Sequence, residues 1–325
     1  MQQPVIATMG KDTRFEGFVL VRMSEQRTGS NGGKSLDMTL ADRTGEMNGK
    51  LWDGNVLPPS TGSVIKVRGL TLEYNGRLQL RIEKLRALEP GDEVDMSALT
   101  PSAPESPEVM LEELDAAIES LNSEPLRKIV AGLVARYREQ LSFYPAAQRI
   151  HHAERSGLLH HTTGMLRLAK AVLPLYPSLN ADLVLSGVMI HDLCKVEEMD
   201  SDSLGVVRDY TENGLLLGHI VMGVARIGEV AAAQGVTGEP VTLLQHMMLS
   251  HHGEENYGSP RKPMFPEAEL LHWIDLLDAR MNEMQTALDK LPEGVFSEKI
   301  WSLERRLYHP QYAALSPAVD AETAK

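Results

Sequence analysis

A proline-rich segment divides this sequence into two parts whose apolar residues follow different periods. Residues 89–108, EPGDEVDMSALTPSAPESPE, hold four prolines among acidic and small residues that offer nothing to pack. Before this segment apolar residues alternate as in strands, and after it they recur at helical spacing. We therefore expect an α+β multidomain protein, with a small β-barrel followed by an all-α bundle. The expected parts are a β domain at 1–90, a linker at 91–107, a helical domain at 108–308 and a flexible tail at 309–325.

The first part predicts about five short strands. VIKVRGLTLEY and RLQLRIEKLRAL are separated by Asn75-Gly76, a strong hairpin signal between alternating runs. So many strands with tight turns suit a small closed barrel. The segment LADRTGEMNGKLWD is similar to strand 2, turn and strand 3 of the OB-fold, which implies binding of single-stranded nucleic acid. A barrel that serves protein contacts, or acts only as a spacer, is the alternative.

The charge of the chain is unevenly distributed. Residues 1–90 hold 13 Lys and Arg against 10 Asp and Glu, whereas the remaining residues hold 19 against 35, within a net charge of −13. A single strand would stack its bases on aromatic side chains while cations follow its phosphates. Each aromatic residue on its own is more often part of the core than a stacking surface. The basic excess on its own would also occur on a solvated surface that has no partner. The candidates for strand binding are Trp52, Tyr74, Lys50 and Arg68, with Phe18, Arg22, Lys34, Arg77 and Arg81.

The compartment follows from cysteine usage and from the apolar segments. Cys194 is the single cysteine, which excludes an intramolecular disulfide and fits a reducing cytoplasm. The N-terminus has no basic segment followed by an apolar one, and no uninterrupted apolar stretch reaches about 18 residues. We expect a cytoplasmic protein without a membrane span.

Ionisable residues lie on apolar helices in the second part. His191-Asp192 ends the run LVLSGVMI, His219 lies within LLLGHIVMGV, and Asp275 lies within LLHWIDLLDA. A buried carboxylate needs a partner or a metal. One His on an apolar face is usually a satisfied core residue, but three such helices together indicate a shared ion in a helix bundle. Asp and His ligands suit Mn, Fe, Co, Ni or Zn.

Five stretches together resemble the HD superfamily of metal-dependent phosphohydrolases, whose pattern is His … His-Asp … Asp. They are HHAERSGLLHHT, LSGVMIHDLCK, LGHIVMGV, HMMLSHHGEENYGSP and EAELLHWIDLLDARM. With the barrel, the chain from Phe15 to Met284 resembles the YhaM-type 3′-5′ exoribonucleases. The resemblance implies two divalent ions, with Mn as the first expectation and Co, Fe or Ni as alternatives. The implied metal ligands are His161, His191, Asp192, His219, His251 and Asp275, with His160 as the alternative to His161 and with His246 and His252 as alternatives to His251.

The resemblance also implies roles around the ions. Asp192 would bridge the two ions, and Lys195 would contact phosphate. His252 or His152 would protonate the leaving 3′-oxygen. The family pattern has Gly where this sequence has Cys194, and a positive φ at that position would strain a cysteine.

Two further residues have implied contacts with the substrate. Arg280 would hold the terminal phosphate, and a surface salt bridge is its alternative. Tyr257 would stack on a base, and an anchor within its loop is the alternative.

The function that follows is metal-dependent 3′-5′ hydrolysis of single-stranded RNA, with single-stranded DNA as a further substrate, to nucleoside 5′-monophosphates. One alternative is an HD phosphohydrolase of nucleotides or cyclic dinucleotides with a regulatory barrel. Another is a non-catalytic regulator that binds single strands. Residues 108–145 would either pack against the metal-binding core or form the subunit contact of a homo-oligomer.

Overall fold

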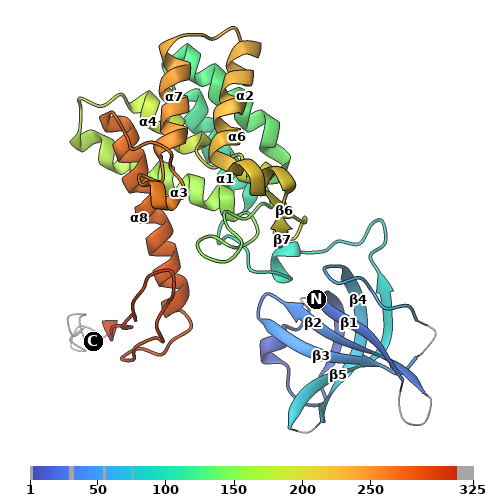
Figure 1. Cartoon of the computed structure of the whole chain (residues 1–325). Helices are drawn as coiled ribbons and strands as arrows, with labels where there is room; N and C mark the ends of the chain where they lie inside the picture. Colours follow the sequence, from blue (N-terminus) through green and yellow to red (C-terminus); the bar gives the residue numbers. More distant parts are fainter. Residues whose placement is uncertain (1–2, 29–32, 54–55, 75, 313–325) are drawn as a thin grey trace, which may run out of the picture. The chain divides into compact units, whose positions relative to one another are not determined.

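The computed structural model forms two compact units, Met1–Ser102 and Ala103–Lys325 (Figure 1). It describes residues 3–28, 33–53, 56–74 and 76–312. Asn75 of the predicted turn and residues 313–325 of the predicted tail lie outside the described residues. The finer domain boundaries expected from the sequence stay predictions.

The first unit is a closed five-stranded barrel with the strand order β1-β2-β3-β5-β4. Antiparallel pairs join all neighbours except β3 and β5, which are parallel and close the barrel. Val19, Met38, Leu40, Val67 and Ile82 are among the alternate residues buried inside it. This confirms the expected barrel of OB-fold type. Its strands are β1 (Arg14–Thr28), β2 (Lys34–Asp42), β3 (Gly45–Leu51), β4 (Val64–Tyr74) and β5 (Arg77–Ala87).

The second unit is a bundle of helices around one continuous apolar core (Figure 1). The two N-terminal helices, α1 and α2, pack against α3, α4 and α6. Residues 108–145 therefore pack on the helices that carry the candidate metal ligands, and a homo-oligomer stays a prediction. The helices are α1 (Pro107–Glu119), α2 (Glu124–Leu141), α3 (Gly157–Val172), α4 (Ala181–Ile190), α5 (Lys195–Glu198), α6 (Glu212–Ala233), α7 (Glu239–Ser250) and α8 (Pro266–Leu288).

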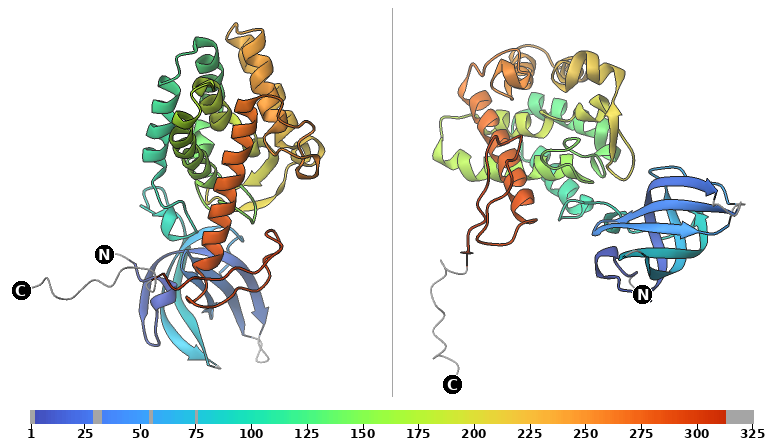
Figure 2. Two further views of the ribbon diagram at one scale, coloured as in Figure 1. Left: turned by 90° about the vertical axis from the view of Figure 1, so that its left-hand side faces the viewer. Right: turned by 60° about the horizontal axis from the view of Figure 1, so that its bottom comes forward.

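Two segments between 108 and 308 are not helical. The polar stretch EEMDSDSLGVVRDYTEN has no apolar face for a helix, which predicts a loop or short hairpin, and it forms a small antiparallel pair, β6 (Met199–Ser201) and β7 (Val207–Tyr210). After α8 the chain folds back along that helix as an irregular hairpin (Figure 2). Pro292 and the positive φ of Gly294 are incompatible with a longer helix there.

Helix α6 is, among the described residues, the one helix long and apolar enough to cross a membrane by length and composition. One such helix is weak support for a span, because core helices pass the same test. Gly218, with φ 71° and ψ 160°, interrupts its helical geometry. The regular part, 219–233, then spans about 22 Å, which is short of a bilayer core of about 30 Å. Helix α6 also packs on α2, α5 and α7, as expected for a core helix.

Candidate metal centre and its cavity

The dipeptide His191-Asp192 is placed deep in the bundle by α4. Asn180 caps this helix, since its side-chain oxygen accepts a hydrogen bond from the Leu183 amide at 3.1 Å. Every residue from Leu183 to Ile190 is buried, so the helix carries its C-terminal end into the core. His191 and Asp192 are consequently buried as well.

Four imidazoles converge on the two oxygens of Asp192. The Nε2 atoms of His161 and His191 lie 3.8 and 3.3 Å from Oδ2. The Nε2 atoms of His219 and His251 lie 3.4 and 3.7 Å from Oδ1. These rings come from α3, the end of α4, α6 and the end of α7. The single carboxylate thus stands between two pairs of nitrogen donors.

Each of these four rings is oriented by a hydrogen bond from its outer nitrogen. An Nδ1–H donated outward leaves the Nε2 lone pair facing the centre, which is the arrangement of metal-ligating histidines. The acceptors are the Val188 carbonyl for His191 at 2.8 Å, the Met248 carbonyl for His251 at 2.8 Å, Asp278 for His161 at 2.7 Å and Glu198 for His219 at 3.0 Å.

Three buried atoms at the centre are unsatisfied. Asp192 Oδ1, His219 Nε2 and His251 Nε2 have no hydrogen-bond partner within the described part of the chain. Buried polar atoms are nearly always bonded, and leaving one without a partner costs about 1–3 kcal/mol. A cation bound between them would satisfy all three. The donor set of imidazoles and carboxylates suits a divalent transition ion.

The donors fall into two groups that share Asp192. In the first group, His161 Nε2 lies 3.2 Å from Asp275 Oδ1 and 3.3 Å from His191 Nε2. The second group adds His252 to Asp192, His219 and His251, with all ligand atoms within 4.8 Å of one another. His246 lies apart from both groups, because its Nε2 accepts the Met264 amide at 3.0 Å.

Helix α6 supplies His219 through the kink at Gly218. The interruption frees the His219 amide, which donates to Glu198 Oε1 at 3.0 Å, and the same carboxylate holds the ring. A positive φ with an extended ψ is nearly restricted to glycine, so the position before His219 favours glycine.

A buried lysine balances the carboxylates. Lys195 Nζ lies 2.7 Å from Asp192 Oδ2. Burial alone would lower the pKa of Lys195, but the charge of Asp192 raises it above its usual range. Burial would raise the pKa of Asp192, but Lys195 and His191 hold it well below its usual range. Lys195 therefore stays protonated beside an ionised carboxylate.

Cys194 is not strained. Its φ and ψ are −74° and −3°, so the expected conflict with a positive φ is absent. The side chain is buried with Sγ 3.6 Å from the Tyr137 hydroxyl, and burial raises the pKa of the thiol to about 11. Cys194 is thus a packing residue at the turn between α4 and α5.

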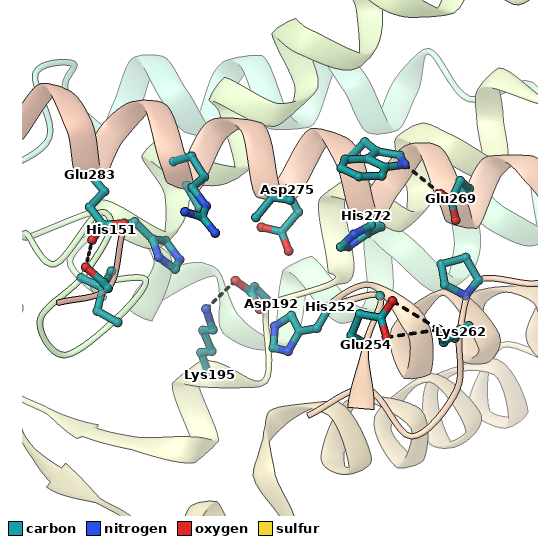
Figure 3. A pocket seen from close by; sticks show the side chains of 18 residues that line it. His151, Asp192, Lys195, His252, Glu254, Lys262, Glu269, His272, Asp275 and Glu283 are labelled. Atoms are coloured by element: carbon teal, nitrogen blue, oxygen red, sulfur yellow. Dashed lines mark hydrogen bonds and ion pairs between the residues drawn. The ribbon is translucent and has the colours of Figure 1, made fainter. Parts of the chain in front are cut away.

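A cavity of 760 Å³ opens onto this centre (Figure 3). That volume is typical of small-molecule sites. Asp192 and Asp275 face each other across it, and Lys195 and His252 also line it. One wall is formed by α8, from which Arg280 and the aromatic rings of His272 and Trp273 line the cavity.

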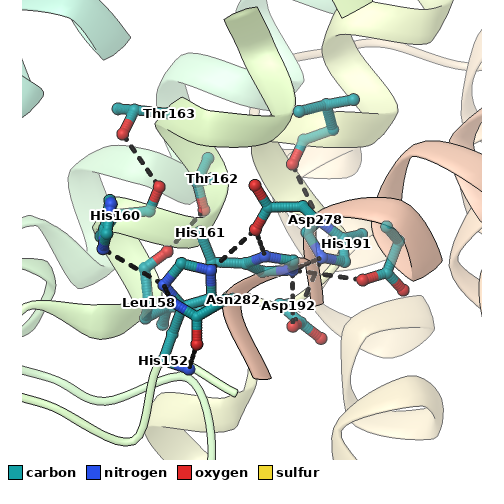
Figure 4. Close-up of polar contacts among 12 residues, drawn as sticks. His152, Leu158, His160, His161, Thr162, Thr163, His191, Asp192, Asp278 and Asn282 are labelled. Carbon is teal, nitrogen blue, oxygen red and sulfur yellow. Dashed lines mark hydrogen bonds and ion pairs between the residues drawn. The ribbon is translucent and has the colours of Figure 1, made fainter. Parts of the chain in front are cut away.

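The structure places His152 behind the centre rather than in the cavity (Figure 4). Its Nε2 lies 2.8 Å from Asp278 Oδ2, and its Nδ1 lies 3.2 Å from His160 Nδ1. His152 therefore cannot reach a leaving 3′-oxygen in the cavity. The neighbouring His151 lines the cavity instead. Burial and the charge of Lys195 lower the pKa of His151 to about 3, so this ring is neutral at pH 7.

Sequence reasoning missed Asp278, although a signal was present. Asp275 and Asp278 stand three residues apart on α8, and this spacing places them on one helix face. His151 had no such signal, because the segment before α3 is irregular. The side chain of Tyr257 lies outside the described residues.

The barrel candidates lie on the surface of the first unit. Trp52 and Tyr74 are 58% and 66% exposed, so neither packs in the core of the barrel. The Lys50 ammonium lies 5.5 Å from the Trp52 ring centroid. Trp52 follows Lys50, which pairs with Arg81 of β5, whereas Tyr74 pairs with Arg77 of the same strand. Trp52 and Tyr74 therefore lie at separate positions on the barrel, about 13 Å or more apart. Arg68 projects from β4, where its Nε lies 3.8 Å from Glu83.

Comparison with known proteins identifies a family model and relatives of this chain. A family model described as HD domain matches residues 158–280. The 3′-5′ exoribonuclease YhaM of Geobacillus sp. is 40% identical over 302 residues, covering 92% of this chain and 92% of the relative. The protein of the same name from Oceanobacillus iheyensis is 38% identical over 306 residues, covering 93% and 95%. Among solved structures, the second OB-fold domain of replication protein A from Methanococcus maripaludis matches 28% of this chain and 100% of that chain, with 17% identity and a TM-score of 0.24.

Proposed function

The chain belongs to the YhaM family of 3′-5′ exoribonucleases, and from this premise we propose that it removes nucleotides from the 3′ end of single-stranded RNA. The reaction is metal-dependent hydrolysis of phosphodiester bonds that releases nucleoside 5′-monophosphates. Single-stranded DNA is a further candidate substrate. The observation that carries the proposal is the set of three buried, unsatisfied atoms, Asp192 Oδ1, His219 Nε2 and His251 Nε2, around a carboxylate that lines an open cavity.

Two ions fit the donors, with Mn as the first candidate and Co, Fe or Ni as alternatives. His161, His191 and Asp275 would hold one ion together with Asp192, which the second ion would share. His219, His251 and His252 would complete the second site. When bound, such ions would polarise the phosphoryl group and lower the pKa of a water molecule.

The protein side chains supply charge and position. Lys195 is a buried cation on the cavity wall and would offset the charge that develops on the non-bridging phosphate oxygens. Arg280, on the α8 wall, would contact the phosphate of the terminal nucleotide. Trp273 and His272 present ring faces and edges that a terminal base can pack against.

His151 and His252 do not suit the role of proton donor to the leaving 3′-oxygen. Burial lowers the pKa values of His151 and His252, which keeps both rings neutral near pH 7. Neutral rings accept protons or bind metals, so His252 suits a ligand role better than the donor role expected for it. Lys195, protonated in the same cavity, is the group that can provide a proton there.

The barrel would hold the upstream part of the same strand. Trp52 and Tyr74 would stack on bases, while Lys50 and Arg68 would follow phosphates. A second binding site raises the local concentration of the 3′ end at the cavity. We place the reaction in the cytoplasm, a proposal supported by the single, unpaired Cys194.

The test is product analysis. The full chain is incubated with Mn and 5′-labelled single-stranded RNA, and in parallel with single-stranded DNA and cyclic dinucleotides. A ladder of shortened 5′-labelled RNA with release of 5′-monophosphates supports the proposal. Hydrolysis of cyclic dinucleotides without RNA shortening would favour the nucleotide phosphohydrolase instead.

A further inference from the structure

A second hollow of 530 Å³ adjoins the metal cavity within the helical unit. The two spaces share Ile150, Glu283 and Ser302 as lining residues, so they are neighbours. The hollow extends from the loop before α3 to the C-terminal part of α8 and the hairpin that follows it. None of its lining residues is among the metal-site donors.

The second hollow carries aromatic rings and cations. Trp301 is 84% exposed and Tyr210 is 38% exposed. Arg149 and Lys290 are exposed and form no ion pair within the described part of the chain. Trp is rarely so exposed in a protein, since burying its ring is favourable. The exposed parts of these four side chains are therefore available to a ligand.

The hairpin after α8 presents Trp301 in a defined turn. Ile300 and Arg305 form an antiparallel bridge, with the Ile300 amide donating to the Arg305 carbonyl at 3.0 Å. The Glu304 amide donates to the Trp301 carbonyl at 3.2 Å. Ser302 donates to the Glu283 carboxylate of α8, which fixes the turn to the helix. The indole ring is thus held at the rim of the hollow by the backbone on both sides.

We propose that this second hollow binds the nucleotides 5′ of the two that the scissile bond joins, both of which lie in the metal cavity. Tyr210 and Trp301 stack on their bases, and Arg149 and Lys290 contact their phosphates. The ligand class is single-stranded nucleic acid, because exposed rings interleaved with cations suit it whatever its sequence. The inference deepens the proposed exoribonuclease function and rests on it.

The Glu283 carboxylate, which lines both spaces, is compatible with binding of a phosphate group beside it. Glu283 accepts the Ser302 hydroxyl. Burial raises the pKa of Glu283, and the nearby Arg280 partly opposes this rise, so its negative charge is both less favoured and partly offset. In the second hollow itself two cations, Arg149 and Lys290, stand against one carboxylate, Glu283.

The test uses the full chain and RNA of two lengths. Trp301→Ala and the double variant Arg149→Ala/Lys290→Ala are compared with wild type on a ribodinucleotide, which fills only the metal cavity, and on a ribodecamer. Trp301→Phe keeps a stacking ring. Tyr176→Ala and Lys170→Ala are matched controls, since Tyr176 is 54% exposed, Lys170 is exposed, and neither lines a hollow.

We expect Trp301→Ala to raise KM for the decamer about 10-fold, which corresponds to about 1.4 kcal/mol. Trp301→Phe should recover most of this loss. The double variant should reduce the slope of log affinity against log salt by about 1.4, since each phosphate contact contributes about 0.7 on single strands. Cleavage of the dinucleotide should stay unchanged in all variants.

An unchanged KM for the decamer, or an equal loss on both substrates, would overturn the inference. If the wild type cleaved neither RNA, the proposed function would fail, and decamer binding by fluorescence anisotropy would still test the hollow. In that assay the same 10-fold loss in Trp301→Ala supports the site. Equal affinity in wild type and variants rejects it, and leaves a protein partner as the ligand of this surface.

Discussion

The carboxylate of Asp278 should determine how tightly the centre holds its metal. One oxygen, Oδ2, lies 2.7 Å from His161 Nδ1 and 2.8 Å from His152 Nε2 (Figure 4). The side chain is 15% exposed, so solvent replaces little of what it provides. Burial would lower the pKa of His152, but Asp278 and Glu154 raise it, which makes the contact charge-assisted. Asp278 therefore orients His161 and increases its basicity as a ligand.

The substitution Asp278→Asn keeps the shape and removes the charge. A hydrogen bond to a charged group contributes about 1.5–3 kcal/mol, against about 1 kcal/mol for a neutral one. The His161 contact should therefore weaken by about 1–2 kcal/mol in the metal-bound state. Outer partners of metal ligands typically change affinity by about 10–100-fold. We expect Mn affinity to fall about 10-fold.

The assay is competition for Mn between the protein and a chelator of known affinity, without substrate. Asp289→Asn is the matched control, because Asp289 ends the same helix, its carboxylate accepts a hydrogen bond from the Gln285 side chain at 2.6 Å, and it belongs to neither donor group. Unchanged Mn affinity in Asp278→Asn, with a folded protein by circular dichroism, would refute the reasoning.

A second variant displaces Asp278 without removing it. A Cβ on Gly164, which faces Asp278 from α3, would lie 2.6 Å from its Oδ1. Gly164→Ala should therefore shift the carboxylate and also weaken Mn binding. Gly228→Ala is its control, because that Cβ would meet only Gln245 Nε2 at 3.4 Å.

Three further predictions concern the same unit. Asp192→Asn should abolish RNA hydrolysis while circular dichroism stays unchanged, and turnover at the wild-type rate would reject the shared-ligand arrangement. Burial would raise the pKa of Glu154, but bonds from His152 and His160 lower it to about 2. The unfolded chain binds this proton at higher pH, so the free energy of unfolding should fall as pH drops from about 4.5 to about 2. Glu154→Gln should lose this pH dependence in urea titrations. An unaltered pH profile in the variant would contradict the role of Glu154. Gly218→Ala should destabilise the protein by about 1–3 kcal/mol, since φ 71° with ψ 160° is strained for alanine; an unchanged urea midpoint would show that the kink relaxes freely.

The two-part architecture and the elements that carry the candidate metal donors could be predicted from the sequence alone. Strand alternation and the tight turns predicted a barrel, and the strand order confirms it. Apolar helices can carry His191, Asp192 and Asp275 inward only if something satisfies them, so composition and period together indicated a shared ion. The cap of α4 by Asn180 is also local, because Asn180 stands just before the apolar run.

Which of two residues adjacent in the sequence faces the cavity was set by the tertiary structure. His151 lines it while His152 bonds Asp278 from behind, and the irregular segment that holds them has no period to distinguish the two. Strand alternation likewise did not identify the exposed positions of Trp52 and Tyr74, which lie at or beyond the ends of their strands.

The second hollow also depended on tertiary structure. Its wall joins residues near 150, 210, 290 and 300, which are brought together by the fold-back after α8. Hydrophobic periodicity predicts which face of a helix is buried, because the apolar stripe is set by the sequence of that helix alone. The identity of the facing residue depends on how helices cross and how loops return, and these are set by the packing of the whole core.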